Sequence, residues 1–219
     1  MVDNNKKAQM HELVRARRVG WIPDGCYRLG DERLNNGFWD EDDHVVPWSK
    51  TACNYNAKVM LVVRDWDAFK NLSVPLTDKH KRIKLVGRNE YLLTNKRIDK
   101  LLSEHLDLAW SDIFATDVFP FIKPGDMRGN LRWPDFVRCA REFALSQIDI
   151  VNPLVVICLG RSTTFRAIAE AAIGQKRTAT NGDDPLGPVQ YNGVEIYGVT
   201  HPGGRGNGWL KRIDFEWAL

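Results

Sequence analysis

The apolar residues of this chain gather in short runs between longer polar stretches. Four runs are rich in β-branched residues and carry few charges, which is typical of strands buried on both faces of a sheet. These runs span residues 59–63, 113–119, 154–159 and 194–200. Between them, residues 95–109 and 134–149 place apolar side chains at helical spacing. The alternation predicts a three-layer α/β/α fold around a central four-stranded, mainly parallel sheet.

The N-terminal part of the chain lacks this regular pattern. Residues 1–10 are polar and are predicted to form a flexible arm, and residues 11–18 a short basic helix. Residues 20–56 are rich in Gly, Pro, Asn, Asp and aromatic side chains, which indicates an irregular segment rather than a second domain. Residues 70–90 are basic and are predicted to be a loop. We therefore expect residues 1–219 to form a single domain.

The third apolar run ends at Gly160, and a helix is predicted to follow it, with Ser162 or Thr163 as its N-cap. Residues 174–192 are predicted to be a polar loop. A Gly-rich turn after residue 200 leads to a closing helix at 209–217.

Composition limits the kinds of partner that the chain can have. It has 31 basic and 28 acidic residues, a net charge of +3, so it is not a histone-like polycation. Any contact with nucleic acid must depend on local clusters of charge. The four cysteines include no C-x-x-C pair, so neither a metal site nor a cofactor is expected. The absence of an apolar leader or membrane-length run predicts a cytoplasmic protein without membrane contact, and we expect a monomer.

Polar and glycine residues follow each of the four apolar runs. In a parallel sheet, the site lies in the crevice beyond the carboxyl ends of the strands. Those ends carry Asp65, Asp117, Gly160 and His201. The sequence therefore predicts that Asp65, Asp117 and His201 converge on one cleft.

The segments at these strand ends resemble, in order, four motifs of the uracil-DNA glycosylase superfamily. They are residues 59–66, 116–124, 152–161 and 200–204. The chain departs from the family pattern at three points. Val63 or Arg64 replaces a glycine of the first motif, Asp117 replaces an asparagine of the second, and Gly203 replaces a serine of the last. Cys139 matches an iron–sulfur ligand of one branch, but the partner cysteines are missing.

The resemblance implies an N-glycosylase that acts on DNA containing a damaged or modified base, with the base flipped into a pocket. Asp65 would stabilise the sugar cation and orient water, and His201 would stabilise the departing base. Asp117, Trp66 and Phe69 would contact the base. Expected contacts with DNA phosphates are Gly203, Gly204, Arg205, Asn207, Lys211 and Arg161.

Each of these residues also has a simpler interpretation. Asp65 could cap a turn or pair with Arg64, and Asp67 competes with it if the register slips by two residues. His201 could be an ordinary sheet-edge histidine, and Trp66 and Phe69 could belong to the core.

Asp117 bears most directly on the function. An asparagine amide both donates and accepts, whereas a carboxylate only accepts and would oppose the O4 atom of uracil unless burial protonates it. Asp117 thus indicates an altered base choice or a lost activity, or it is a structural cap. Two other functions therefore stay open: a catalytically inactive nucleic-acid-binding relative, and a nucleotide- or phosphate-handling enzyme on the same fold.

Overall fold

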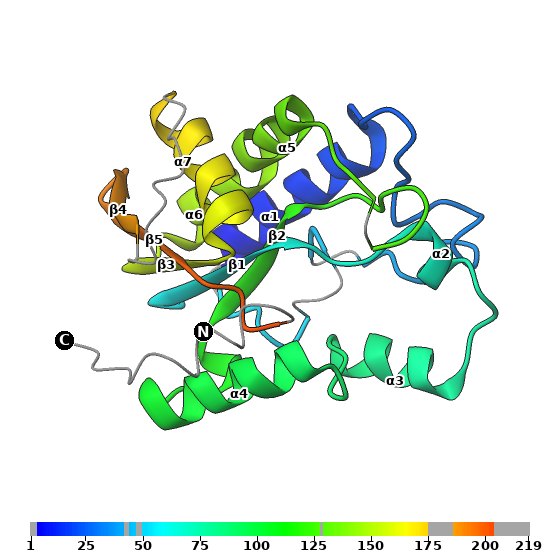
Figure 1. The fold of residues 1–219 in the computed structure, drawn as a ribbon, viewed down its shortest axis with the longest axis horizontal. Coiled ribbons are helices and arrows are strands. Elements are labelled where there is room, and N and C mark those ends of the chain that lie inside the picture. The colour runs from blue at the N-terminus through cyan, green and yellow to red at the C-terminus, as the bar shows by residue number, and fades with distance from the viewer. Residues whose placement is uncertain (1–3, 42–43, 47–49, 128, 175–185, 204–219) are drawn as a thin grey trace.

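The computed structural model describes residues 4–41, 44–46, 50–127, 129–174 and 186–203 (Figure 1). Its centre is one five-stranded sheet with the order β2-β1-β3-β5-β4. The strands are β1 (Val59–Asp65), β2 (Phe114–Phe119), β3 (Val155–Leu159), β4 (Leu186–Tyr191) and β5 (Val194–Val199). The first four in this order run parallel, and β4 pairs antiparallel with β5. The α/β class and the four predicted strands are confirmed.

The fifth strand corrects the predicted loop at 174–192, because β4 occupies its second half. Asn192 and Gly193 both have positive φ angles, 49° and 84°, and join β4 to β5 as a tight turn. An Asn-Gly pair between two extended segments is a strong hairpin signal. The sequence of β4 is partly polar because the strand lies at the sheet edge. There Val189 is buried, whereas Gln190 is exposed.

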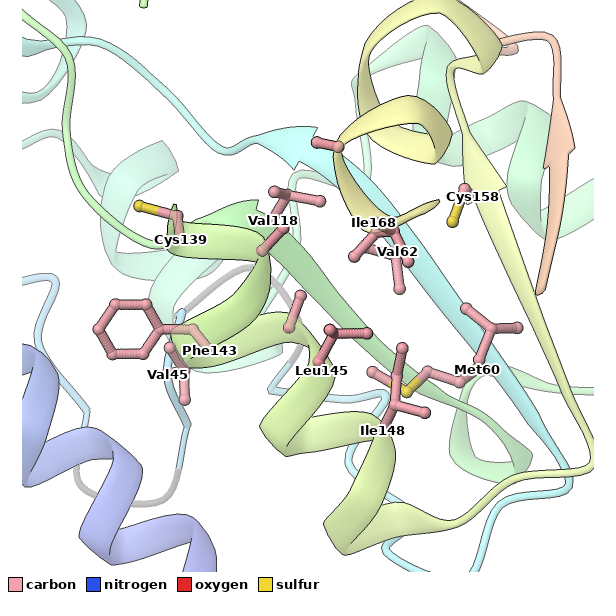
Figure 2. Close-up of a cluster of buried hydrophobic side chains, with 14 of the residues drawn as sticks. Val45, Met60, Val62, Val118, Cys139, Phe143, Leu145, Ile148, Cys158 and Ile168 are labelled. Atoms are coloured by element: carbon pink, nitrogen blue, oxygen red, sulfur yellow. The ribbon is translucent and has the colours of Figure 1, made fainter. Parts of the chain in front are cut away.

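Helices cover both faces of the sheet and make three layers (Figure 1). One face carries α1 (Asn4–Val19), α5 (Trp133–Cys139), α6 (Leu145–Val151) and α7 (Arg166–Ile173). Figure 2 shows Leu145, Ile148 and Ile168 of these helices packed over Met60 and Val62 of β1. The opposite face packs against α4 (Leu93–His105), whose Ile98 and Leu102 belong to the same core cluster as the alternate β1 residues Leu61 and Val63. Burial on both faces explains why the strands read as continuous apolar runs.

The predicted helix at 134–149 is part of a longer helical stretch. Helix α5 passes through a single π-helical turn, Ala140–Ala144, directly into α6. Asn152, in the left-handed conformation, ends the stretch before β3. The helix predicted at 95–109 is also present, as α4.

The predicted flexible arm at 1–10 is wrong, because α1 begins at Asn4. Met10 is fully buried against the core, and Lys6 Nζ donates to the carbonyls of Tyr55 and Val151, both at 2.9 Å. The segment looks unstructured in isolation because its mean hydropathy is low. Tertiary contacts with residues far along the chain decide its conformation.

The predicted loop at 70–90 is also wrong, because it contains α3 (Asp78–Val86) and the end of α2 (Phe69–Leu72). Thr77 and His80 form a reciprocal capping box at the start of α3, and Gly87 ends it with a φ of 80°. A histidine replaces the usual Glu or Gln of such a box, so the signal is easily missed.

Residues 20–41 and 50–56 contain turns and isolated bridges, and no helix or strand. They cover one end of the molecule through a small core of their own, in which Leu29, Leu34 and Trp39 pack against Leu72 and Ile122. Among the described residues, no helix is long and apolar enough to cross a membrane.

Candidate functional site

A cleft of about 1150 Å³ opens at the carboxyl ends of the parallel strands. Asp65, Asp117 and His201, from three different strand ends, all line it. Asp117 lies beside Val63 in the register of β1 and β2, and Asp65 follows Val63 by two residues. Both carboxyl groups therefore project from the face of the sheet that α4 covers. The predicted convergence of these three residues is confirmed, while their catalytic roles stay predictions.

Asp65 is the last residue of β1 and its side chain is 5% exposed. Arg64 donates two hydrogen bonds to its oxygens, Nε to Oδ1 and Nη2 to Oδ2, both at 3.0 Å. Lys123 Nζ forms an ion pair with Oδ2. The pairing with Arg64 that the sequence left open is thus present. A buried carboxylate is stable only with such partners, so Asp65 is held as an anion in one orientation.

Lys123 follows β2 and is completely buried. Its ammonium group contacts Asp65 and also donates to the carbonyl of Met127 at 2.9 Å. Sequence reasoning placed Lys123 inside a motif of the second strand end but gave it no role. The available signal was the position of Lys123, which follows an apolar strand directly and precedes Pro124 and Gly125.

Asp117 lies in the fully buried strand β2, and neither of its carboxyl oxygens has a hydrogen-bond partner in the described part of the chain. Burial, with a smaller effect from the charge of Asp65, raises the pKa of Asp117 well above its usual value. An ionised carboxylate without a partner would be far more costly in this position than the neutral acid. Burial without a partner thus favours the neutral carboxylic acid, which presents one donor and one acceptor.

His201 follows β5, and its Nδ1 accepts a hydrogen bond from the amide of Gly203 at 3.0 Å. Burial lowers the pKa of His201, so the ring is neutral at neutral pH. Because Nδ1 accepts, the proton of the neutral ring sits on Nε2. The loop is tied to α4, since Arg97 donates to the carbonyl of Pro202 at 2.5 Å.

Asn95, in the first turn of α4, also lines the cleft and is completely buried. Its Nδ2 donates to the carbonyl of Asn89 at 2.9 Å, whereas its Oδ1 has no partner within the described residues. Sequence reasoning missed Asn95. The only signal was a polar residue on the apolar side of a predicted helix, one turn before Ile98.

Asp67 lines the cleft but has a local structural role. Its Oδ1 accepts from the amide of Ala68 at 2.8 Å and from Asn71 Nδ2 at 2.7 Å. These contacts are those of a turn cap before α2. Burial raises the pKa of Asp67.

The two aromatic candidates lie in different places. Trp66 lines the cleft, and its ring packs edge-on against Trp39 with centroids 5.0 Å apart. The structure does not place Phe69 in the cleft lining. Its ring instead contacts Tyr27 of the irregular segment, with centroids 4.4 Å apart. The turn after β1 directs Phe69 toward that segment.

Arg161, the predicted phosphate contact after β3, lines the cleft. The helix that it begins has no side-chain cap, so the predicted caps Ser162 and Thr163 are wrong. Gly160, with a φ of 123°, occupies the cap position instead, and Thr164 Oγ1 donates to the carbonyl of Leu159 at 3.1 Å.

Gly203 is the last described residue of the chain. A β-carbon at this position would lie 2.6 Å from Thr94 Oγ1 and 2.9 Å from His201 Cε1. A larger residue after Pro202 would therefore require Thr94 or His201 to shift. The other predicted phosphate contacts, and the closing helix at 209–217, lie outside the described residues: Gly204, Arg205, Asn207 and Lys211.

Comparison of the chain with protein-family models gives no match, and comparison with curated proteins gives none either. The functional argument therefore rests on the cleft and its side chains.

Proposed function

We propose that this protein is a DNA N-glycosylase that removes a flipped, deaminated or otherwise modified base. The observation that supports this most strongly is the placement of an oriented carboxylate, Asp65, and a neutral histidine, His201, in one cleft. Glycosidic cleavage creates a sugar cation and a base anion, and these two groups suit the two charges.

In the proposed reaction, the bond between C1′ of the sugar and the ring nitrogen of the base breaks, and the electron pair leaves with the base. The anion of Asp65 stabilises the sugar cation and orients the water that adds to C1′. The Nε2 proton of His201 donates a hydrogen bond to the departing anion. The proton that the water loses passes to solvent or to the base. Lys123 keeps Asp65 ionised and in position.

The charge of the cleft also supports a nucleic-acid substrate. Arg64, Lys70, Lys79, Arg161 and Arg166 line it. With Asp117 neutral, Asp65 and Asp67 are the acidic groups that oppose them. A cationic cleft attracts the phosphates next to a flipped nucleotide.

One observation favours the alternative that the protein binds nucleic acid without cleaving it, here called the binding-only alternative. The carboxylate of Asp65 is already occupied by Arg64 and Lys123, which weakens its effect on a sugar cation. In the glycosylase, Arg64 must turn toward a DNA phosphate, and its side chain, 39% exposed, has room to do so. A binding protein would leave all three side chains paired.

The test is excision from oligonucleotides that carry uracil, hypoxanthine or xanthine, as single and double strands, with an unmodified strand as the negative control. Alkaline cleavage reports excision, and binding is measured in parallel at two salt concentrations. We expect excision of at least one modified base, lost in Asp65→Asn and kept in Asp149→Asn. Asp149 is a matched carboxylate on α6 that contacts Tyr191 and Asn192, away from the cleft. Salt-dependent binding without excision selects the binding-only alternative.

A further inference from the structure

Three large apolar side chains lie exposed in a row where α3 is joined to α4, in residues 87–93, here called the α3–α4 turn. Tyr91, Leu92 and Leu93 are 65%, 46% and 55% exposed. Single exposed apolar residues are common on protein surfaces, but a consecutive run of them is a liability unless it has a function. Figure 1 shows α3 and α4 one after the other along the side of the molecule opposite α5, α6 and α7.

Hydrogen bonds through Asn89 hold the backbone of this turn. Its Oδ1 accepts from the amide of Tyr91 at 3.1 Å, and its carbonyl accepts from the amide of Leu92 at 3.0 Å. The same carbonyl accepts from Asn95 Nδ2 at 2.9 Å, which ties the turn to α4. The apolar side chains are therefore presented outward by an ordered turn.

The α3–α4 turn adjoins the cleft. Leu92 lines the cleft, and so do Asn89 before it and Thr94 after it. Lys79, one turn into α3, lines the cleft as well. The exposed apolar surface is thus continuous with the cleft, and an elongated ligand that leaves the cleft on this side passes over the turn.

The segment around the turn carries the positive charge of the chain. Residues 78–100 contain eight basic and three acidic residues, a net charge of +5, whereas the whole chain has +3. Lys79 and Lys96 are exposed and have no ion-pair partner among the described residues. Unpaired cations beside exposed aromatic and aliphatic side chains are complementary to a strand of nucleic acid, which offers phosphates and base faces.

We propose that the α3–α4 turn binds an unpaired stretch of the DNA strand whose flipped nucleotide occupies the cleft. This inference rests on the proposed function and adds to it a second contact surface, outside the cleft. The ring of Tyr91 stacks on the face of a base, and Leu92 and Leu93 cover apolar surface next to it. Lys79 and Lys96 contact the phosphates on either side.

The turn should distinguish an unpaired strand from a duplex. In a duplex, the stack covers both faces of each base, so Tyr91 has no face to contact. The phosphates are accessible in both forms, and Lys79 and Lys96 attract both. The apolar side chains therefore add affinity for the unpaired strand alone.

The test measures binding of the full chain to a fluorescent thymidine oligonucleotide about ten nucleotides long. It carries no modified base, so its binding does not depend on excision. Fluorescence anisotropy follows the single strand and its duplex with the complementary strand. Tyr91→Ala and Leu93→Ala remove the exposed side chains, and Tyr91→Phe keeps the ring. Leu154→Ala is the matched control, because Leu154 is 67% exposed and precedes β3, at the opposite edge of the sheet.

We expect Tyr91→Ala to weaken binding of the single strand by about fivefold to a hundredfold, as for one lost stacking contact. Its affinity for the duplex should change by less than about twofold, because the phosphate contacts remain. Leu93→Ala should act in the same direction as Tyr91→Ala. Tyr91→Phe and Leu154→Ala should bind both forms as the wild type does.

A second pair of variants tests the phosphate contacts. Lys96→Glu should weaken binding of both the single strand and the duplex, and it should reduce the dependence of affinity on salt. Lys58→Glu is the control, because Lys58 is exposed and directly precedes β1, away from the cleft. Equal effects of the two changes would show that the charge at the turn makes no contact with phosphates.

The inference fails if Tyr91→Ala binds the single strand as the wild type does, or if it weakens the single strand and the duplex equally. Loss of binding to phosphatidylserine vesicles, or of self-association in sedimentation, with strand binding unchanged would assign the turn to a membrane or to a second copy of the chain.

The result separates this inference from the proposed function. If the strand binds as expected while no modified base is excised, the strand-binding turn stands and the proposed glycosylase function fails. If modified bases are excised while Tyr91→Ala leaves strand binding unchanged, the function stands and this inference fails.

Discussion

Asp65 and Asp117 project from adjacent parallel strands into the same cleft, and among the described residues only Asp65 has cationic partners. Arg64 and Lys123 form ion pairs with Asp65, whereas burial without a partner in the described part of the chain raises the pKa of Asp117. Two carboxyl groups on one sheet face thus have different electrostatic surroundings: one is paired with cations and the other is buried without them. In the proposed glycosylase, Asp65 is the carboxylate that acts on the sugar cation.

The ion pair of Lys123 with Asp65 should contribute strongly to stability. Lys123→Ala leaves a buried carboxylate with Arg64 alone, so we expect the free energy of unfolding to fall by about 3 kcal/mol. Urea denaturation measures the change. The matched control is Lys81→Ala, which breaks the exposed pair with Asp78 and should cost less than about 0.5 kcal/mol. Equal effects in the two variants would show that the Lys123 pair is not a buried one.

The raised pKa of Asp117 predicts how stability changes with pH. The folded protein keeps a proton on Asp117 that the unfolded chain loses near pH 3.9, the ordinary value for Asp, so the stabilising contribution is full below that pH. It is lost as pH rises toward the folded-state pKa, at up to about 1.4 kcal/mol per pH unit.

Asp117→Asn removes this dependence. The unfolding free energy of the variant minus that of the wild type should therefore increase with pH above about 4. Urea unfolding at several pH values gives the difference. A constant difference across this range would mean that Asp117 is ionised in the folded protein.

The protonation of His201 should determine how the excision rate falls at acidic pH, that is, the acid limb of the pH–rate profile. Burial lowers its pKa below the ordinary value of about 6.5, so the neutral ring persists at neutral pH and is lost only in more acidic solution. Protonation at Nδ1 also breaks the hydrogen bond from the Gly203 amide. The excision rate should thus fall as pH drops through a value below 6.5.

His201→Gln should lower the rate about 10²- to 10³-fold and remove the acid limb, because glutamine does not titrate. His105→Gln, at the exposed end of α4, is the control and should change neither property. Retention of the acid limb in His201→Gln would assign that limb to another group.

The close approach of Gly203 to Thr94 predicts a coupled pair. Gly203→Ala places a β-carbon against Thr94 Oγ1 and should destabilise the fold by about 1–3 kcal/mol. Adding Thr94→Ala removes one of the two clashes, so the double variant should recover part of the loss. A double-mutant cycle by urea unfolding measures this coupling. Simple additivity of the two changes would contradict the contact.

The sequence by itself determined the class of fold and the location of the cleft. Continuous apolar runs such as 59–63 are stable only when both faces are covered, and that requirement predicts the parallel sheet between helices. Parallel strands bring their carboxyl ends to one edge, so the sequence alone predicts that Asp65, Asp117 and His201 lie together. Local signals also existed for elements that were missed, as Asn192-Gly193 shows for β4.

The tertiary structure decided the chemical state of each group. Helix α1 is ordered because Lys6 reaches the carbonyls of Tyr55 and Val151, contacts that no local pattern contains. The ion pair of Lys123 with Asp65 joins residues 58 positions apart. The raised pKa of Asp117 depends on which groups surround it after folding. Desolvation and ion pairing depend on which groups are neighbours in the folded structure. They are therefore not predicted from the order of residues alone.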